Sequence, residues 1–310
     1  MKLKINKKAV YLILSICLGH LGYSQKDTAP SKEVVAFLDT FRKDYEAMYR
    51  NENFRLVQDR YGENVRLMPE FQETVLGLIP SAMYYVAFFE RFEIDSYGRE
   101  NIEILDLESR VVELGRFQMN ISDIEGEYLL TGKYQNVWEL TSKGTYELIT
   151  EAWSYDNWVE FGDKLRFKDV PSVRMALEPH ILVNDNISFE IEALNCLMEK
   201  VIMEGDTKRW SLFYSNDAML IGGFHPIAKG RKAIENHLIE LSEEEPLFEK
   251  LDVRTDGIIE LDGYALEYSS TIENWRDDWS SGISTSKNIK LWKREPNGSL
   301  KIFRMINMYD

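Results

Sequence analysis

The sequence repeats one pattern, at Tyr61-Gly-Glu-Asn-Val-Arg-Leu-Met-Pro-Glu-Phe71 and again at Tyr214-Ser-Asn-Asp-Ala-Met-Leu-Ile-Gly-Gly-Phe224. A glycine follows each segment at the same distance, Gly77 in the first place and Gly230 in the second. Tyr, Phe and Gly therefore keep one spacing at two distant positions. Such a repeated spacing indicates that one structural unit occurs twice in the chain.

Further segments repeat in the same order. Residues 105–115 are similar to residues 251–263. Later positions with matching spacing are Trp138, Gly144, Tyr155 and Asp156 in the first copy and Trp292, Gly298, Tyr309 and Asp310 in the second. We therefore expect two similar domains over residues 30–156 and 187–310, with residues 157–186 as the segment that connects them.

Each copy is predicted to begin with an amphipathic helix, because apolar residues recur there every three or four positions. These residues are Val34, Phe37, Leu38, Phe41, Tyr45 and Met48 in the first copy and Ile191, Leu194, Met198, Val201 and Ile202 in the second. A short helix follows, over residues 54–60 or 207–214, and then a hairpin. A third helix begins at Pro80 or spans residues 231–241, and three or four strands complete the unit.

This order of elements resembles that of the nuclear transport factor 2-like superfamily. The second copy is similar to the SnoaL-like branch at Asp217-Ala-Met-Leu, Gly230-Arg-Lys-Ala-Ile-Glu and Leu291-Trp-Lys-Arg-Glu-Pro-Asn-Gly-Ser-Leu-Lys-Ile302. The first copy is degenerate, since it keeps only Gly77 of the Gly-Arg-x-x-Ile element. The resemblance implies an α+β fold of two tandem cone-shaped, cystatin-like domains, each a curved antiparallel sheet wrapped on helices. It also implies a cavity inside the cone that suits a small, partly hydrophobic ligand.

The strand expected over residues 300–309 is apolar on both of its faces. Leu300, Ile302, Ile306 and Met308 lie on one face, and Phe303, Met305 and Tyr309 lie on the other. A strand that is wet on one side is apolar on the other side only. We therefore expect the two sheets to pack back to back as a pseudo-dimer within a monomer.

The first residues are typical of an export signal. Four lysines precede an apolar run over residues 9–18, and Gly22-Tyr23-Ser24 follows it. This pattern predicts a signal peptide over residues 1–24, and the run is shorter than the ~20 residues of a membrane span. Ile16 is bulky for the residue before a lipidated Cys17, which argues against a lipoprotein. We expect a periplasmic or extracellular protein.

Composition excludes several classes of function. The 310-residue chain has a formal net charge of −15, which disfavours binding to nucleic acid and anionic membranes. No later segment stays apolar for about 18 residues, so membrane insertion is not expected. The chain has few Cys and His residues and no glycine-rich phosphate loop. We therefore expect no metal site and no cofactor. Cys196 is expected to be a buried residue on an apolar helix face.

The candidate site lies in the second copy. The predicted ligand-binding residues are Trp210, Tyr214, Phe224, His225, Trp275 and Asn307. His225 and Asp217 are the candidate acid–base pair, because a histidine titrates near neutral pH and a buried carboxyl can act as a base. Each has a structural alternative: a loop histidine for His225, a turn carboxylate for Asp217 and a core aromatic for Tyr214. Trp275 and Trp279 form either a contact surface or the anchor of a loop.

The sequence thus favours an exported protein that binds a small, partly hydrophobic ligand in the second cone. The alternative is an acid–base isomerase, cyclase or lyase related to ketosteroid isomerase and SnoaL. A third possibility is a structural pseudo-dimer whose cones are filled by methionine and aromatic side chains, such as Met305 and Met308.

Overall fold

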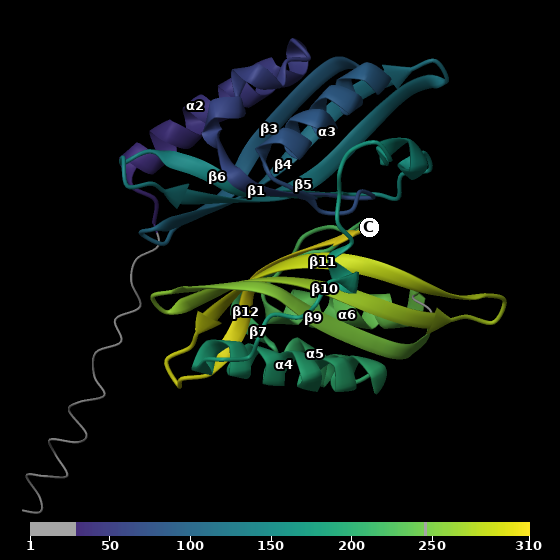
Figure 1. Cartoon of the computed structure of the whole chain (residues 1–310). Helices are drawn as coiled ribbons and strands as arrows, with labels where there is room; N and C mark the ends of the chain where they lie inside the picture. Colours follow the sequence, from purple (N-terminus) through teal and green to yellow (C-terminus); the bar gives the residue numbers. More distant parts are fainter. Residues whose placement is uncertain (1–28, 245–246) are drawn as a thin grey trace, which may run out of the picture.

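The chain forms two stacked α+β halves, each built on its own six-stranded sheet (Figure 1). The computed structural model describes residues 29–244 and 247–310. The predicted signal peptide and Cys17 lie outside the described residues. In both halves a long helix is followed by short helical turns, a strand, a two-residue strand, a second helix and a meander of long strands. The predicted repeat of one unit is therefore confirmed.

The first half opens with helix α2 (Lys32–Arg50). Ser31 caps the helix, since its Oγ accepts the Val34 N–H at 3.2 Å. The buried face carries Val34, Leu38, Phe41, Tyr45, Met48 and Tyr49. Because these residues are spaced three and four apart, they lie on one side of the helix. That side faces the interior of the cone, as the sequence predicts.

The first sheet has the strand order β2-β1-β6-β5-β4-β3. Its strands are β1 (Tyr61–Pro69), β2 (Val75–Leu76), β3 (Glu93–Asp106), β4 (Arg110–Asp123), β5 (Gly126–Leu140) and β6 (Tyr146–Tyr155). Helix α3 (Leu78–Arg91) connects β2 to β3, and the 3-10 turns η1 (Phe54–Leu56) and η2 (Gln58–Arg60) replace the short helix expected there. Helix α3 starts at Leu78, whereas the sequence predicted a start at Pro80, two residues later.

The second sheet repeats this order as β8-β7-β12-β11-β10-β9. Its strands are β7 (Tyr214–Ile221), β8 (Ala228–Lys229), β9 (Leu247–Leu261), β10 (Tyr264–Arg276), β11 (Ser281–Arg294) and β12 (Leu300–Tyr309). The helices are α4 (Asn186–Met203), α5 (Thr207–Ser211) and α6 (Arg231–Glu244).

The long strands pair antiparallel, as expected, but each sheet also contains one parallel pair. β1 runs parallel to β6, and β7 runs parallel to β12. The long strands β3–β6 and β9–β12 follow one another by tight turns, which enforce antiparallel pairing. The partners of β1 and β7 are the last strands of each meander, far along the chain. No tight turn therefore connects these pairs or fixes their relative direction.

The two sheets face each other across a shared apolar layer, and the helices cover their outer faces (Figure 1). Met68, Leu114 and Val137 of the first sheet belong to one buried cluster with Phe303 and Ile306 of the second. Burying a side chain of this size contributes roughly 1.5–3 kcal/mol. The layer explains why β12 is apolar on both faces, and it confirms the predicted pseudo-dimer within the chain.

The segment between the halves packs on both of them. It contains the turns η3 (Gly162–Leu165) and η4 (Met175–Leu177). Leu165 and Phe167 are buried in the first core, and Arg254 of the second half donates to the carbonyl of Ala176 at 3.1 Å. Within the described ranges, no helix has the length and apolar character that crossing a membrane requires.

Candidate ligand-binding site

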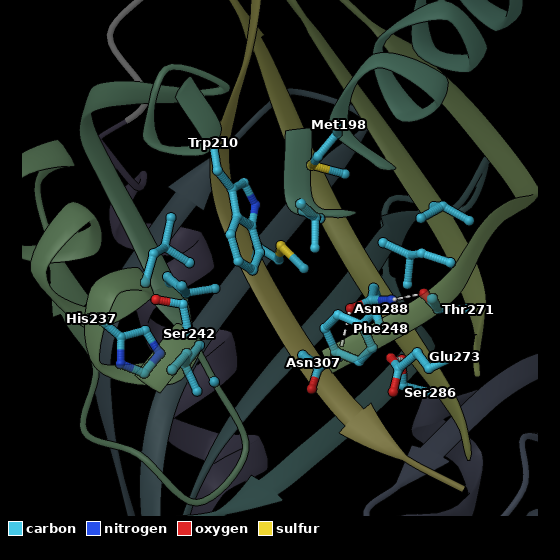
Figure 2. Close-up of a pocket in the computed structure, with 18 of the residues that line it drawn as sticks. Met198, Trp210, His237, Ser242, Phe248, Thr271, Glu273, Ser286, Asn288 and Asn307 are labelled. Carbon is cyan, nitrogen blue, oxygen red and sulfur yellow. Dashed lines mark hydrogen bonds between the residues drawn. The ribbon is translucent and has the colours of Figure 1, made fainter. Parts of the chain in front are cut away.

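A cavity of about 360 Å³ opens inside the second half, between its sheet and its helices (Figure 2). Helices α4, α5 and α6 supply one wall, and strands β7 and β9–β12 supply the other. The apolar lining includes Met198, Ile202, Trp210, Leu220, Leu238, Phe248, Leu251, Val253 and Met305. The volume lies within the ~300–1,000 Å³ range of small-molecule pockets.

One edge of this cavity is polar. Asn288 and Asn307 are direct partners on β11 and β12, and Asn307 Nδ2 donates to Asn288 Oδ1 at 2.9 Å. Asn288 Nδ2 in turn donates to Thr271 Oγ1 at 3.4 Å. These three side chains line the cavity (Figure 2). Because the hydrogen bonds fix their orientation, they offer a ligand a preset pattern of donors and acceptors.

Glu273 adds a carboxylate to the same edge. Its oxygens accept from Ser284 Oγ at 2.9 Å and from Ser286 Oγ at 3.1 Å. Glu273 and Ser286 both line the cavity. An edge of two amides, hydroxyls and one carboxylate favours a ligand with hydrogen-bond donors at its polar end.

Two histidines meet on the opposite side. The rings of His225 and His237 lie 4.9 Å apart, edge to face, and both line the cavity. Burial lowers the pKa of His237 to about 4, with smaller contributions from His225 and the Lys133 ammonium. His237 is therefore neutral at pH 7 and has one ring nitrogen able to accept a proton. His237 is buried on α6, with 8% of its surface exposed.

A buried ionic cluster supports one wall of the cavity. Glu267 Oε2 accepts from Trp292 Nε1 at 2.7 Å and lies 3.4 Å from the Lys290 ammonium. Asn195 donates to Glu267 Oε1 at 2.7 Å and accepts from Lys290 Nζ at 3.1 Å. Every charge in this cluster has a partner, which a buried ion pair requires. The cluster ties helix α4 to strands β10 and β11.

The structure brings together most of the residues predicted for the site. Trp210, Tyr214, Phe224, His225 and Asn307 all line the cavity. Their spacing in the repeat placed them in the second cone. Of the side chains that form the polar edge, only Asn307 was predicted from the sequence. Asn288, Thr271 and Glu273 alternate with apolar residues on long strands, a pattern shared by many solvent-exposed strands.

Two predicted residues lie elsewhere. The Asp217 side chain is 61% exposed and pairs with Lys293 at 2.9 Å, and neither residue lines the cavity. Burial opposes ionisation of Asp217, but bonds from Lys293 and Ser215 prevail and lower its pKa. The expected pairing of His225 with Asp217 is therefore absent, and the ring of His237 takes that place beside His225.

Trp275 also lies outside the cavity lining. It belongs to strand β10 rather than to a loop, and it pairs with Gly282 across the hairpin. A Cβ at Gly282 would lie 2.7 Å from the Trp275 ring, so the ring covers that glycine. Trp279 at the turn is 95% exposed. Cys196, expected to be buried, is exposed on α4.

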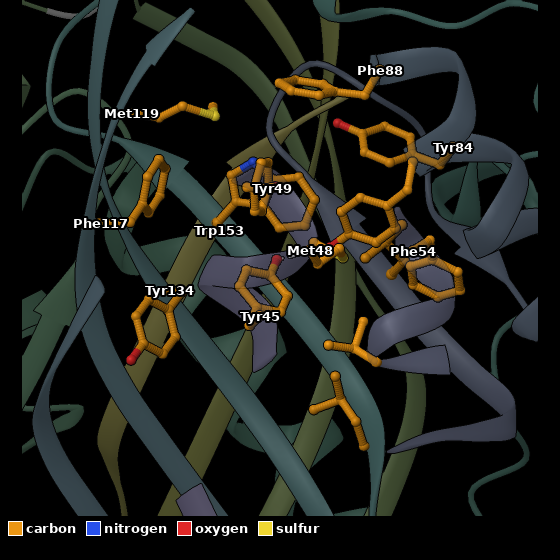
Figure 3. Close-up of a cluster of buried hydrophobic side chains, with 14 of the residues drawn as sticks. Tyr45, Met48, Tyr49, Phe54, Tyr84, Phe88, Phe117, Met119, Tyr134 and Trp153 are labelled. Carbon is orange, nitrogen blue, oxygen red and sulfur yellow. Dashed lines mark hydrogen bonds between the residues drawn. The ribbon is translucent and has the colours of Figure 1, made fainter. Parts of the chain in front are cut away.

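The corresponding space in the first half is filled by aromatic side chains (Figure 3). Only about 20 Å³ remains between them. Glu151 lies at the centre and accepts from Tyr61 at 2.5 Å and from Tyr85 at 2.8 Å. Burial raises the pKa of Glu151, while the tyrosine hydrogen bonds oppose that change. Tyr45 joins the network through Tyr85 at 2.9 Å.

The two halves nevertheless share one buried motif. Glu113 accepts from Trp138 Nε1 at 3.0 Å, as Glu267 accepts from Trp292 in the second half. The shared element order, sheet order and Glu–Trp bond establish one fold used twice. Each half is an α+β unit of helices covered by a six-stranded sheet, the arrangement that the resemblance to the nuclear transport factor 2-like superfamily implies. The expectation from the sequence is thus confirmed for the fold, and the two domains differ in how much of the cone is filled.

Comparison with known proteins gives matches in structure only. No protein-family model and no curated protein matches the chain. A ketosteroid isomerase-like protein from Erwinia carotovora atroseptica is 17% identical, with 39% of this chain and 94% of that chain covered and a TM-score of 0.35. A nuclear transport factor 2-like protein with a cystatin-like fold from Novosphingobium aromaticivorans is 17% identical, over 41% and 92% of the chains, with a TM-score of 0.34. A nuclear transport factor 2-like protein from Cytophaga hutchinsonii is 14% identical, over 41% and 99%, with a TM-score of 0.34.

Among residues 29–244 and 247–310, no group of three or more His, Cys, Asp or Glu side chains is arranged to hold a metal ion.

Proposed function

We propose that this protein binds a small, partly hydrophobic ligand in the cone of its second domain. The observation that carries the proposal is the contrast between the halves: a cavity of about 360 Å³ in the second and about 20 Å³ in the first. Apolar cavities of this size bury most of a small molecule, and that burial drives binding. The first domain, filled by its own aromatic rings, serves as a structural partner.

The lining defines the chemistry of the ligand. An apolar body would contact Met198, Trp210 and Phe248, and a polar end would face Asn288 and Asn307. A neutral molecule with a hydroxyl or amino group at one end satisfies both walls. A strongly anionic head would be repelled by Glu273 on the same edge.

Native mass spectrometry of protein purified from its own host tests the proposal directly. We expect a co-purified molecule that organic solvent removes. Binding of the neutral fluorescent probe 1-aminoanthracene gives a second measurement. Met305→Trp, which replaces a thioether chain in the cavity lining with an indole ring, should abolish probe binding. Val86→Trp, on the exposed face of α3, is the matched control and should not affect it. Equal binding by both variants would refute the proposal.

Acid–base catalysis in the same cavity is the second candidate, and the paired rings of His225 and His237 favour it. A neutral His237 can accept a proton from a bound substrate. The test is exchange of the α-hydrogens of small cyclic ketones in deuterated water, followed by NMR. If the protein catalyses exchange and the His237→Gln variant does not, catalysis is established. If exchange in the presence of the protein is no faster than in buffer alone, the protein only binds its ligand.

Export completes the proposal. The lysines and apolar run at the start support a periplasmic or extracellular location. Sequencing the N-terminus of protein isolated from its host tests this, with Gln25 expected as the first residue. A retained Met1 in the cytoplasmic fraction would refute it. Size-exclusion chromatography with light scattering tests the proposed monomer.

A further inference from the structure

The two domains exchange matching contacts at one end of their shared interface. The Phe71 N–H donates to the carbonyl of Tyr309 at 3.0 Å, and the Phe224 N–H donates to the carbonyl of Tyr155 at 2.9 Å. Phe71 and Phe224 occupy equivalent positions in the repeat, and their rings stack at 5.7 Å. The contact is therefore an internal pseudo-two-fold, in which each domain holds the loop that follows the first strand of the other.

A buried lysine from each domain reinforces this exchange. Lys133 on β5 crosses to the second domain, where its Nζ donates to the carbonyls of Gly222 at 3.0 Å and His225 at 2.6 Å. The Lys133 side chain is fully buried, and Asp156 at 3.2 Å balances its charge. Lys287 occupies the equivalent position on β11, and its Nζ donates to the carbonyl of Gln72 in the first domain.

The two lysines hold loops that differ in one respect. Gly222, Gly223, Phe224 and His225 line the cavity of the second domain. Gln72, held by Lys287, lines neither the cavity nor the small space in the first domain. Of the bonds that these two lysines make across the interface, only those of Lys133 reach residues that line the ligand cavity.

We propose that Lys133 is a positioning residue for this cavity, through which the first domain sets the shape of the site in the second. The proposal rests on the ligand-binding function proposed above. Lys133 does not itself line the cavity, but bonds to two residues that do. It fixes the carbonyls at both ends of the segment from Gly222 to His225, and so fixes where the ring of His225 lies relative to His237.

Glu70 shows how closely this segment is held. Glu70 directly precedes Phe71, as Gly223 directly precedes Phe224, so the two positions are equivalent. They meet at the pseudo-two-fold: a Cβ at Gly223 would lie 3.5 Å from Glu70 Oε2. The other oxygen of Glu70 accepts the Tyr309 N–H at 2.7 Å. Glu70 therefore packs against the loop that Lys133 holds.

The test compares Lys133→Met with Lys287→Met. Both variants remove a buried ammonium that bonds to carbonyls across the same interface, so they should lose similar amounts of unfolding stability in urea. We expect Lys133→Met to weaken 1-aminoanthracene binding about tenfold or more, as the loss of charged hydrogen bonds implies. Lys287→Met should keep an affinity close to that of the unaltered protein. Equal affinities for both variants would overturn the proposal.

A second readout does not depend on any ligand. The Lys133 charge helps to lower the pKa of His237, so Lys133→Met should raise that pKa in an NMR titration and shift the amide signals of residues 222–225. Lys287→Met should do neither. If the unaltered protein binds no probe, the proposed ligand function fails, but these signals still decide the role of Lys133. Unchanged signals in Lys133→Met would overturn it. Lys133→Gln, which keeps a donor without the charge, replaces Lys133→Met if the latter does not fold.

Discussion

Glu70 should make the stability of this protein fall as pH rises. The carboxyl is 1% exposed, and burial raises its pKa from 4.5 to about 8, against the smaller effects of the Tyr309 N–H and the Lys287 and Lys133 charges. Between those pH values the native state holds a proton that the unfolded chain has released. Unfolding therefore becomes easier by up to about 1.4 kcal/mol per pH unit, on the order of 5 kcal/mol in total. Above pH 8 the effect is constant.

Glu70→Gln isolates this effect, because a neutral amide cannot titrate. We expect urea unfolding, followed by tryptophan fluorescence, to show unaltered protein losing stability relative to Glu70→Gln from pH 5 to pH 8. Glu63→Gln is the control, since Glu63 is exposed on β1, the strand that ends just before Glu70. Stability curves of the unaltered protein and Glu70→Gln that stay parallel over this range would show that Glu70 is ionised in the native state, and the reasoning from its burial would be refuted.

Three further predictions follow from contacts described by the structure. A Cβ at Gly132 would lie 2.4 Å from the Ser154 carbonyl, so Gly132→Ala should destabilise the first domain by about 1–3 kcal/mol in urea, whereas Gly126→Ala, with open space around it, should have little effect. Trp292→Phe removes a 2.7 Å donor from buried Glu267 and should cost about 1–3 kcal/mol by the same assay; a smaller loss would mean that Glu267 finds another donor. His237, with its pKa lowered to about 4, should stay neutral in NMR titrations above pH 5, and stability should rise with pH between about 4 and 6.5 relative to His237→Gln; a midpoint near 6.5 would contradict its burial.

The fold was predictable because its signals are local and occur twice. The spacing of Tyr, Phe and Gly around residues 61–77 and 214–230 marks the same strand and hairpin in both domains. The double-sided apolar pattern of β12 predicted the packing of the two sheets. Parallel pairing of β1 with β6 was not predictable, because it joins strands far apart in the chain and no turn residue records it.

The site was predictable only where the repeat placed it. Trp210, Tyr214 and His225 lie within or next to the repeated segment, so their place in the second cone followed from the fold. His237 could not be assigned to the site, because one histidine on a helix with charged and apolar residues intermixed does not reveal which face it occupies. The role of Lys133 could not be predicted, because it bonds to backbone carbonyls of the other domain. A backbone carbonyl leaves no signal in the sequence.

A two-fold axis between identical subunits forces each residue beside it to face its own copy. Two glutamates there would bring two buried carboxyl groups together, and two glycines would leave a gap. Joining the subunits in one polypeptide removes that constraint, since Glu70 now faces Gly223. Covalent linkage thus permits one domain to fill its cone with side chains while the other keeps an open cavity. An assembly of identical subunits cannot differ in this way.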